Sequence, residues 1–173
     1  SLQLQVKPAA FKVLSQNNSG GNQIPGTKYY TVRQKTVDGQ TTPMSTPHGP
    51  VIVYDLDPFN VAINNGYSVA AAQTESGTVG TTISIEISNL EPGAFPLAEI
   101  IAVETIDGTI TSNIIHTFTI PFDGVYQYTH TGFEAKIPIN INEVLVAGLR
   151  SGLTMIKAKN INSVDSRAVL SNI

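Results

Sequence analysis

The 173-residue chain contains no cysteine and no tryptophan, and only 13% of its residues are charged. The absence of cysteine excludes disulfides, cysteine nucleophiles, cysteine-ligated zinc and iron–sulfur clusters. No apolar run approaches the roughly 20 residues that a membrane-spanning helix requires, so we expect no membrane partner. A chain of this length buries enough surface to fold without a metal or a disulfide.

Threonine, isoleucine and valine are abundant, and hydrophobic residues make up 41% of the chain. The 14 glycines and 10 prolines supply the residues that turns require. β-Branched segments interrupted by turn residues are typical of all-β proteins. The composition therefore favours a structural or binding module over a helical enzyme.

Charge is sorted along the chain, although the net charge is only −3. Residues 1–35 hold five basic side chains and no acidic one, whereas residues 36–135 hold eleven acidic side chains and no lysine or arginine. Residues 136–173 hold five basic and two acidic side chains. The acidic centre would repel a phosphate backbone, so we expect no nucleic-acid partner. Two interpretations remain open: the basic ends fold back onto the acidic centre, or the acidic centre docks on a basic neighbour in an assembly.

Alternating apolar and polar residues predict antiparallel strands. The clearest example is Thr82–Ser88, in which isoleucine occupies every second position, as in a strand with one buried face. Asp38-Gly39 and Asp107-Gly108 follow the long strands expected at 27–37 and 98–106, and both pairs predict two-residue hairpin turns. Further strands are expected at residues 2–6, 11–14, 51–54, 109–120, 126–128, 137–141, 155–158 and 168–170.

One short helix is expected in the last third of the chain. Asparagine is a common helix cap, so Asn142 is expected to start this helix, with Val144, Leu145 and Leu149 on its apolar side. Gly152 would end it, because glycine readily adopts the left-handed conformation that follows a helix.

No motif for catalysis or cofactor binding stands out. The chain has no Gly-x-Ser-x-Gly segment and no P-loop, so we expect neither an enzyme nor a cofactor. Two sets of side chains have the chemistry of metal ligands: a histidine pair with an aspartate for zinc, and carboxylates with an amide for calcium. Their spacing requires no metal, and we expect none. The zinc set is Asp123 with two of the three histidines His48, His116 and His130, and the calcium set is Asp55, Asp57 and Asn60.

Tyr126 and Tyr128 are the candidate ligand contacts. Alternation places both side chains on one face of a strand. Carbohydrate-binding sandwiches stack sugars on exposed aromatic rings, so a sugar contact is one interpretation. The other is that both rings pack into the core and leave their hydroxyl groups at its rim.

Residues 83–115 resemble the last three strands of a fibronectin type III or immunoglobulin-like sandwich. An alternating strand leads into a Leu-x-Pro-Gly turn, and a second strand leads through Asp-Gly to a third strand with a serine. Members of the family usually carry an aromatic residue after the Pro-Gly turn, whereas Phe95 comes too early here and Ile100 or Ile101 stands at that place. The resemblance is carried by Leu90, Pro92, Gly93, Glu99–Glu104, Asp107, Gly108 and Ser112.

Two further segments are similar to parts of large phage and prophage structural proteins. Residues 25–34, followed by Asp38-Gly39, resemble the tyrosine-rich opening strand and hairpin of immunoglobulin-like modules in those proteins. Residues 128–173 resemble a linker from such a module into the next domain. The resemblance implies a structural module of a virion or a cell surface, with protein partners and without catalysis.

The sequence therefore predicts an all-β fold in two parts. Residues 1–121 are expected to form an antiparallel fibronectin III or immunoglobulin-like sandwich. Residues 122–173 are expected to form a C-terminal extension, with strands and one short helix, that begins a following domain. We expect a non-catalytic structural or interaction module of a larger phage-like or cell-surface assembly. The alternative is a carbohydrate-binding sandwich that contacts sugar through Tyr126 and Tyr128.

Overall fold

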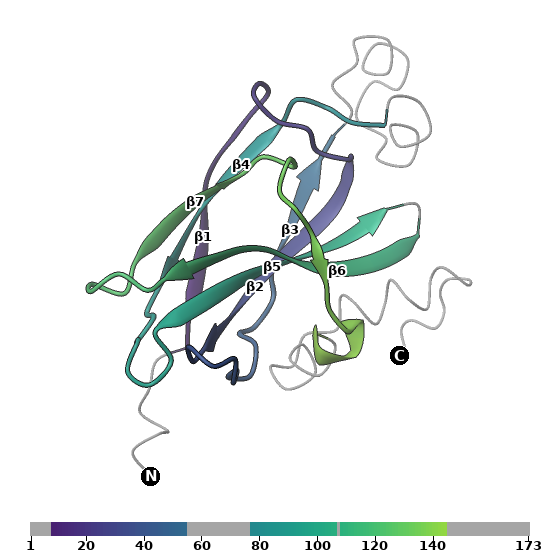
Figure 1. Ribbon diagram of the computed structural model, residues 1–173. Coiled ribbons are helices and arrows are strands. Elements are labelled where there is room, and N and C mark those ends of the chain that lie inside the picture. Colours follow the sequence, from purple (N-terminus) through teal and green to yellow (C-terminus); the bar gives the residue numbers. More distant parts are fainter. Residues whose placement is uncertain (1–7, 55–76, 107, 145–173) are drawn as a thin grey trace.

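The computed structural model describes residues 8–54, 77–106 and 108–144. Over these ranges, eight strands form two antiparallel sheets and residues 141–144 form a helical turn (Figure 1). The prediction of an all-β fold is confirmed. The three-stranded sheet consists, in order, of β1 (Ala10–Asn17), β4 (Thr82–Ser88) and β7 (Tyr126–His130). The five-stranded sheet consists, in order, of β3 (His48–Val53), β2 (Gly26–Lys35), β5 (Leu97–Ile106), β6 (Thr109–Thr119) and β8 (Ile137–Pro138).

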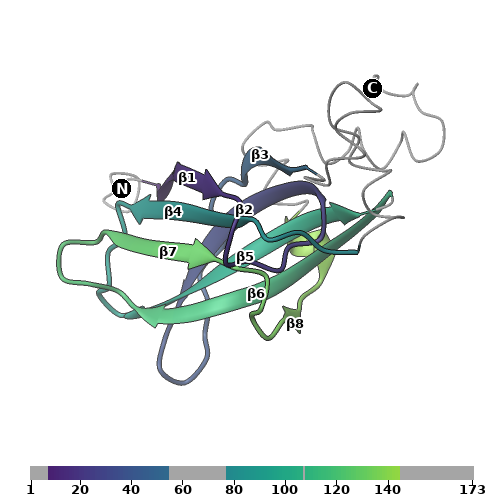
Figure 2. The same cartoon turned by 90° about the horizontal axis from the view of Figure 1, so that it is seen from above.

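The two sheets enclose the main core of the protein. The isoleucines of β4 are completely buried, as their alternation predicted. They pack against the other sheet, to which β2 contributes Tyr30 and Val32 and β5 contributes Ile100 and Ala102. Seen from above, β1, β4 and β7 lie side by side in one layer (Figure 2). The arrangement is therefore sandwich-like.

A second core covers the outer face of the five-stranded sheet. The chain that follows β8 supplies one side of this core and packs against residues of β2, β5 and β6. A sheet that is buried on both faces has nearly continuous apolar strands, which explains why β5 is buried over seven consecutive residues. The second core comprises Tyr29, Ile101, Val103, Ile114 and Val144, with Ile139 and Ile141 packed against it.

The predicted two-residue connection between β5 and β6 is confirmed. Ile106 pairs with Thr109 in the ladder, which leaves two residues between the strands. Gly108 has φ +78°, a backbone conformation that glycine adopts at little cost.

The turn after β2 differs from the prediction. Thr36 and Gln40 close a three-residue loop, since the Thr36 N–H donates to the Gln40 carbonyl at 2.8 Å. Gly39, with φ +104°, is the last residue of this loop, as in a type I turn followed by a bulge. The return segment forms only an isolated bridge before β3, because Pro43 and Pro47 have no N–H group to donate to a ladder.

Residues beyond position 121 contribute strands to both sheets. β7 pairs with β4 in the three-stranded sheet, and β8 pairs with Asn113 and Ile114 of β6 in the five-stranded sheet. Strands that the sequence assigned to the C-terminal extension thus complete the sandwich, while the start of a following domain stays a prediction. No helix within the described ranges is long and apolar enough to cross a membrane.

The helical turn begins earlier than predicted, because its cap is Asn140 and not Asn142. The side-chain Oδ1 of Asn140 accepts a hydrogen bond from the backbone N–H of Asn142 at 2.9 Å. This start places Ile141 and Val144, three residues apart, on the helix side that packs on the second core. Outside the described residues lie Leu145, Leu149, Gly152 and the strands expected at 2–6, 155–158 and 168–170.

Alanine at Gly124 is expected to destabilise the protein much more than alanine at Gly108. The two glycines have nearly equal φ angles, +73° and +78°, so backbone strain of about 1–2 kcal/mol applies to both. A Cβ on Gly124 would also lie 2.4 Å from the Leu90 carbonyl oxygen, whereas a Cβ on Gly108 would meet nothing within 4 Å. Urea denaturation should show a loss for Gly124→Ala at least about twice that for Gly108→Ala. Equal losses would contradict the close approach of the turn at 121–124 to Leu90.

Candidate functional site

Tyr126 and Tyr128 lie on β7 in a group of four stacked rings, which we call the aromatic stack. The other two rings, His116 and Phe118, come from β6 in the opposite sheet. Phe118 and Tyr126 are almost parallel, with ring centroids 3.7 Å apart and an interplanar angle of 5°. His116 and Tyr128 stack with their centroids 4.3 Å apart. The aromatic stack therefore links the two sheets along one flank of the sandwich.

Both tyrosine hydroxyls are engaged in hydrogen bonds. The Tyr126 hydroxyl lies 2.8 Å from Nε2 of His116, and the Tyr128 hydroxyl donates to Oε2 of Glu134 at 2.6 Å. Both rings are half-buried and pack against the main core. Burial and the adjacent Glu134 carboxylate raise the pKa of Tyr128. These contacts agree with the interpretation of core packing, while a sugar contact at the two tyrosines stays a prediction.

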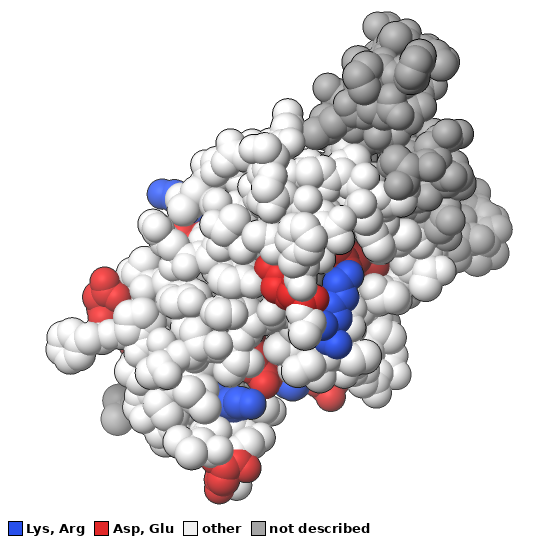
Figure 3. Space-filling view, turned by 45° about the horizontal axis from the view of Figure 1, so that its top comes forward, with Lys and Arg blue, Asp and Glu red and all other residues white. Residues whose placement is uncertain are grey.

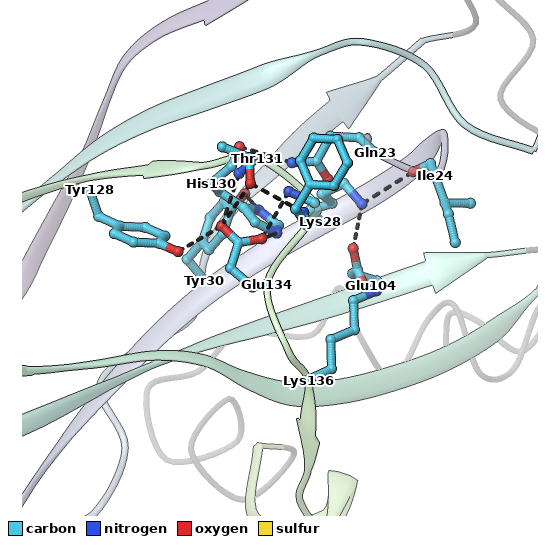
Figure 4. A network of polar contacts seen from close by, with 12 residues as sticks. Gln23, Ile24, Lys28, Tyr30, Glu104, Tyr128, His130, Thr131, Glu134 and Lys136 are labelled. Carbon is cyan, nitrogen blue, oxygen red and sulfur yellow. Dashed lines mark hydrogen bonds and ion pairs between the residues drawn. The ribbon is translucent and has the colours of Figure 1, made fainter. Parts of the chain in front are cut away.

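Glu134 organises the segment that carries the chain from β7 in one sheet to β8 in the other. We call residues 131–136 the crossing segment (Figure 4). The Glu134 carboxylate accepts hydrogen bonds from the backbone N–H groups of Thr131, at 3.0 Å, and Gly132, at 2.8 Å. Burial alone would raise the pKa of Glu134, but the hydrogen bonds from Tyr128 and Thr131 lower it below its ordinary value. The carboxylate is therefore ionised at neutral pH and caps the start of the crossing segment.

His130 is completely buried beside this carboxylate. Its Nδ1 lies 2.6 Å from the Tyr30 hydroxyl, and its Nε2 lies 3.6 Å from Oε1 of Glu134, too far for a hydrogen bond. Among the described residues, Nε2 has no hydrogen-bond partner. Burial lowers the pKa of His130 to about 4, so the ring is neutral at pH 7. The neutral ring best accepts from Tyr30 at Nδ1 and directs its Nε2 proton toward Glu134.

Lys28 and Glu104 form an ion pair sealed between the sheets. They face each other in the β2–β5 ladder, and Lys28 Nζ lies 2.5 Å from Glu104 Oε2. Nζ also donates to the Ile24 carbonyl at 3.2 Å, and Lys136 Nζ donates to Glu104 Oε1 at 3.3 Å. Burial lowers the pKa of Lys28 despite the carboxylate beside it. Burial would raise the pKa of Glu104, but Lys28 and Lys136 lower it below its ordinary value.

A separate set of ion pairs lies on the outer face of the five-stranded sheet. Glu99 of β5 accepts from Arg33 Nε at 2.8 Å and lies 3.1 Å from Lys35 Nζ. Arg33 also donates to Glu143 at 3.0 Å, which ties the helical turn to β2. Burial would raise the pKa of Glu99, but Arg33 and Lys35 lower it. Figure 3 shows basic and acidic side chains next to each other on a face that otherwise carries little charge.

These ion pairs bear on the two interpretations of the sorted charge. Basic residues of β2 pair with acidic residues of β5, and Lys136 pairs with the acidic centre from the other side of the sequence. In the described part of the chain, basic residues from both ends therefore fold back onto the acidic centre. Docking of that centre on a basic neighbour is not required to balance Glu99 and Glu104.

The structure separates the side chains that the sequence offered as zinc ligands. His116 belongs to the aromatic stack, His130 faces Tyr30 and Glu134, and Asp123 accepts a hydrogen bond from the Val125 N–H at 3.1 Å. Within the described ranges, no three His, Asp or Glu side chains are grouped so that they could hold a metal ion. The calcium candidates Asp55, Asp57 and Asn60 lie outside those ranges.

Comparisons with known proteins do not assign the chain to a family. No protein-family model matches it, and no curated protein matches it.

Sequence reasoning missed the buried polar network around Lys28, Glu104, His130 and Glu134. One signal was available, because Lys28 and Glu104 each stand inside a strand that is otherwise rich in apolar residues. A charged residue at a position whose neighbours two residues away are buried needs a partner of opposite charge. The identity of that partner depends on the pairing of strands 76 residues apart, which no local pattern contains.

Lys28→Met is expected to lower the free energy of unfolding by about 3–5 kcal/mol, because Glu104 would stay buried with only Lys136 as a partner. Lys35→Met is the matched control. Lys35 is more exposed and Glu99 keeps a second basic partner, so the loss should stay below about 1 kcal/mol. The double variant Lys28→Met/Glu104→Gln should lose less than Lys28→Met alone, since it leaves neither charge of the pair buried. Chemical denaturation at pH 7 measures all three, and equal losses for the two lysines would contradict the buried pair.

Proposed function

We propose that the chain is a non-catalytic structural or interaction module of the fibronectin III or immunoglobulin-like type, within a larger phage-like or cell-surface assembly. The strand arrangement supports this class. β1 lies beside β4 in one sheet and β2, β5 and β6 lie side by side in the other, as strands B and E and strands C, F and G do in an immunoglobulin-like sandwich. β7 takes the place beside β4 that strand D has in that class. This last strand comes from the C-terminal side and departs from the family pattern.

One observation carries the proposal of a structural role: ionisable side chains are bonded to one another across the sandwich. Lys28 and Lys136 are paired with Glu104, and Tyr128 is bonded to Glu134. Groups held in this way connect β2, β5, β7 and the crossing segment. They stiffen the body of the module, as a spacer in an assembly requires.

The geometry gives less support to the carbohydrate-binding alternative. A sugar stacks on the free face of an aromatic ring. In the aromatic stack, Phe118 covers one face of Tyr126 and His116 covers one face of Tyr128. At most one face of each tyrosine ring is left for a ligand.

Sugars are therefore expected to leave the tyrosine fluorescence of the protein unchanged, and a glycan array should give no binding. The titration is carried out with the wild-type chain and with Tyr126→Ala. A saturable response that disappears in Tyr126→Ala would favour the carbohydrate-binding alternative. The same response in both proteins would locate a sugar site away from the aromatic stack.

Antibodies raised against the purified chain are expected to label assembled particles or the cell surface of the organism that encodes it. Immunogold electron microscopy of particles and of intact cells gives the measurement, with pre-immune serum as the control. Label confined to the soluble cell interior would contradict the proposed assembly.

A further inference from the structure

The crossing segment is held in place largely by side chains. At its start, the Thr131 carbonyl accepts a hydrogen bond from the Asn22 N–H at 2.7 Å. Beyond its end, two residues of β8 pair with β6, Ile139 exchanges hydrogen bonds of 3.1 and 3.2 Å with Ser112, and Glu143 is paired with Arg33. Between these points, Glu134 and Lys136 supply the described polar side-chain contacts to neighbouring strands. Each of the strands β2, β4 and β5 is paired with a neighbouring strand on both sides. The crossing segment is therefore the part of this region that opens most easily.

The charges around His130 balance only while its ring is neutral. β2 contributes the Lys28 ammonium, β5 contributes the Glu104 carboxylate, and the crossing segment contributes Glu134 and Lys136. The remaining titratable groups that face this site, the hydroxyls of Tyr30 on β2 and Tyr128 on β7, are neutral at physiological pH. A proton on His130 adds a third positive charge to two ammonium and two carboxylate groups, in a place that excludes water.

Protonation also conflicts with the hydrogen bond at Nδ1. Nδ1 lies 2.6 Å from the Tyr30 hydroxyl, and it accepts from that hydroxyl in the neutral tautomer that directs the Nε2 proton toward Glu134. An imidazolium carries a proton on both nitrogens, so Nδ1 can no longer accept. The fully buried Tyr30 hydroxyl would have to turn its proton toward another acceptor. The charged ring therefore fits the closed arrangement poorly in two independent respects.

Movement of the crossing segment, the outermost part of the chain over His130, is the least costly way to bring water to a protonated ring. Phe133 in the crossing segment is 67% exposed, and Ile137 just beyond it is 57% exposed, so this segment lies at the surface. Its displacement would bring water to His130 without breaking the β2–β5 ladder. It would also loosen Ile139, Ile141 and Val144, which follow it in the chain and cover the second core.

We propose that the crossing segment is an acid-operated latch: uptake of one proton at His130 releases residues 131–144, β8 included, from β6 and β2, while strands β1 to β7 stay paired. Release removes Ile139, Ile141 and Val144 from Tyr29, Ile101 and Val103, which keep only Met44 and Ile110 as apolar cover among the described residues. The latch does not depend on the proposed function, because it concerns only the body of the module.

Hydrogen exchange at pH 7 and pH 5, corrected for the intrinsic exchange rates, tests the latch. For a ring with a pKa of 6.5 when released and about 4 when closed, the open population should rise on the order of 20-fold between the two pH values. Peptides from 131–144 should lose protection by that factor, whereas peptides from β2, β4 and β5 should keep theirs. Unchanged protection of 131–144 at pH 5, or equal loss in all strands, would overturn the proposal.

Two variants assign the effect to His130. His130→Gln has no titrating ring, so protection of residues 131–144 should be the same at both pH values. His48→Gln is the matched control and should keep the response of the wild type, because His48 lies on β3 beside Phe11. A pH response that persists in His130→Gln would overturn the latch.

The wild-type protein provides a second measurement in case His130→Gln does not fold. The ring proton signals of His130 are followed by NMR between pH 3.5 and 7.5. They should titrate below pH 5, and the protection of residues 131–144, already lower at pH 5 than at pH 7, should fall further across this titration. Titration near the ordinary histidine value, while 131–144 stays protected, would contradict the latch.

Discussion

A pair of opposite charges sealed between two sheets is the constraint on which the rest of the structure depends. Lys28 and Glu104 are costly to bury separately, and they are tolerable together only if β2 and β5 meet in one register. A slip by one residue would turn Lys28 to the outer face and bring Tyr29 inward. The same register sets Arg33 opposite Glu99 on the outer face. One alignment of the two strands therefore satisfies ion pairs on both faces of the sheet.

The pair also explains why residues beyond position 121 belong to the sandwich. Glu104 has two carboxylate oxygens, and the second one is bonded to Lys136. Two residues before Lys136, Glu134 accepts bonds from Tyr128 and from the start of the crossing segment. The crossing segment thus supplies one charge of each sign to the buried network. A sandwich that ended at residue 121 would lack both, together with the strand β7 that pairs with β4.

Local patterns predicted the parts of the fold that depend on neighbouring residues. The alternation of Thr82–Ser88 identified β4 and its buried face, and Asp107-Gly108 identified a tight connection. The two-residue hairpin predicted at Asp38-Gly39 was wrong. The residues after it include Pro43 and Pro47, which have no N–H group with which to continue a ladder. The network around His130 could not be predicted, since it joins residues from four segments of the chain. Alternation placed Tyr126 and Tyr128 on one face, but not the β6 rings that stack on them.

The surfaces that remain for a partner follow from the same packing. The five-stranded sheet has the main core on one face and the second core on the other, so it offers a partner little apolar surface while the crossing segment is closed. The outer face of the three-stranded sheet is polar, with Gln127 bonded to Glu86 and Ser84 bonded to Thr129. Exposed apolar side chains are found instead at turns and at a sheet edge: Phe122 between β6 and β7 is completely exposed, and Phe133 of the crossing segment and Ile137 of β8 are also exposed. An interaction role therefore points to the turns and edges of the sandwich, with its faces serving to hold the strands in register.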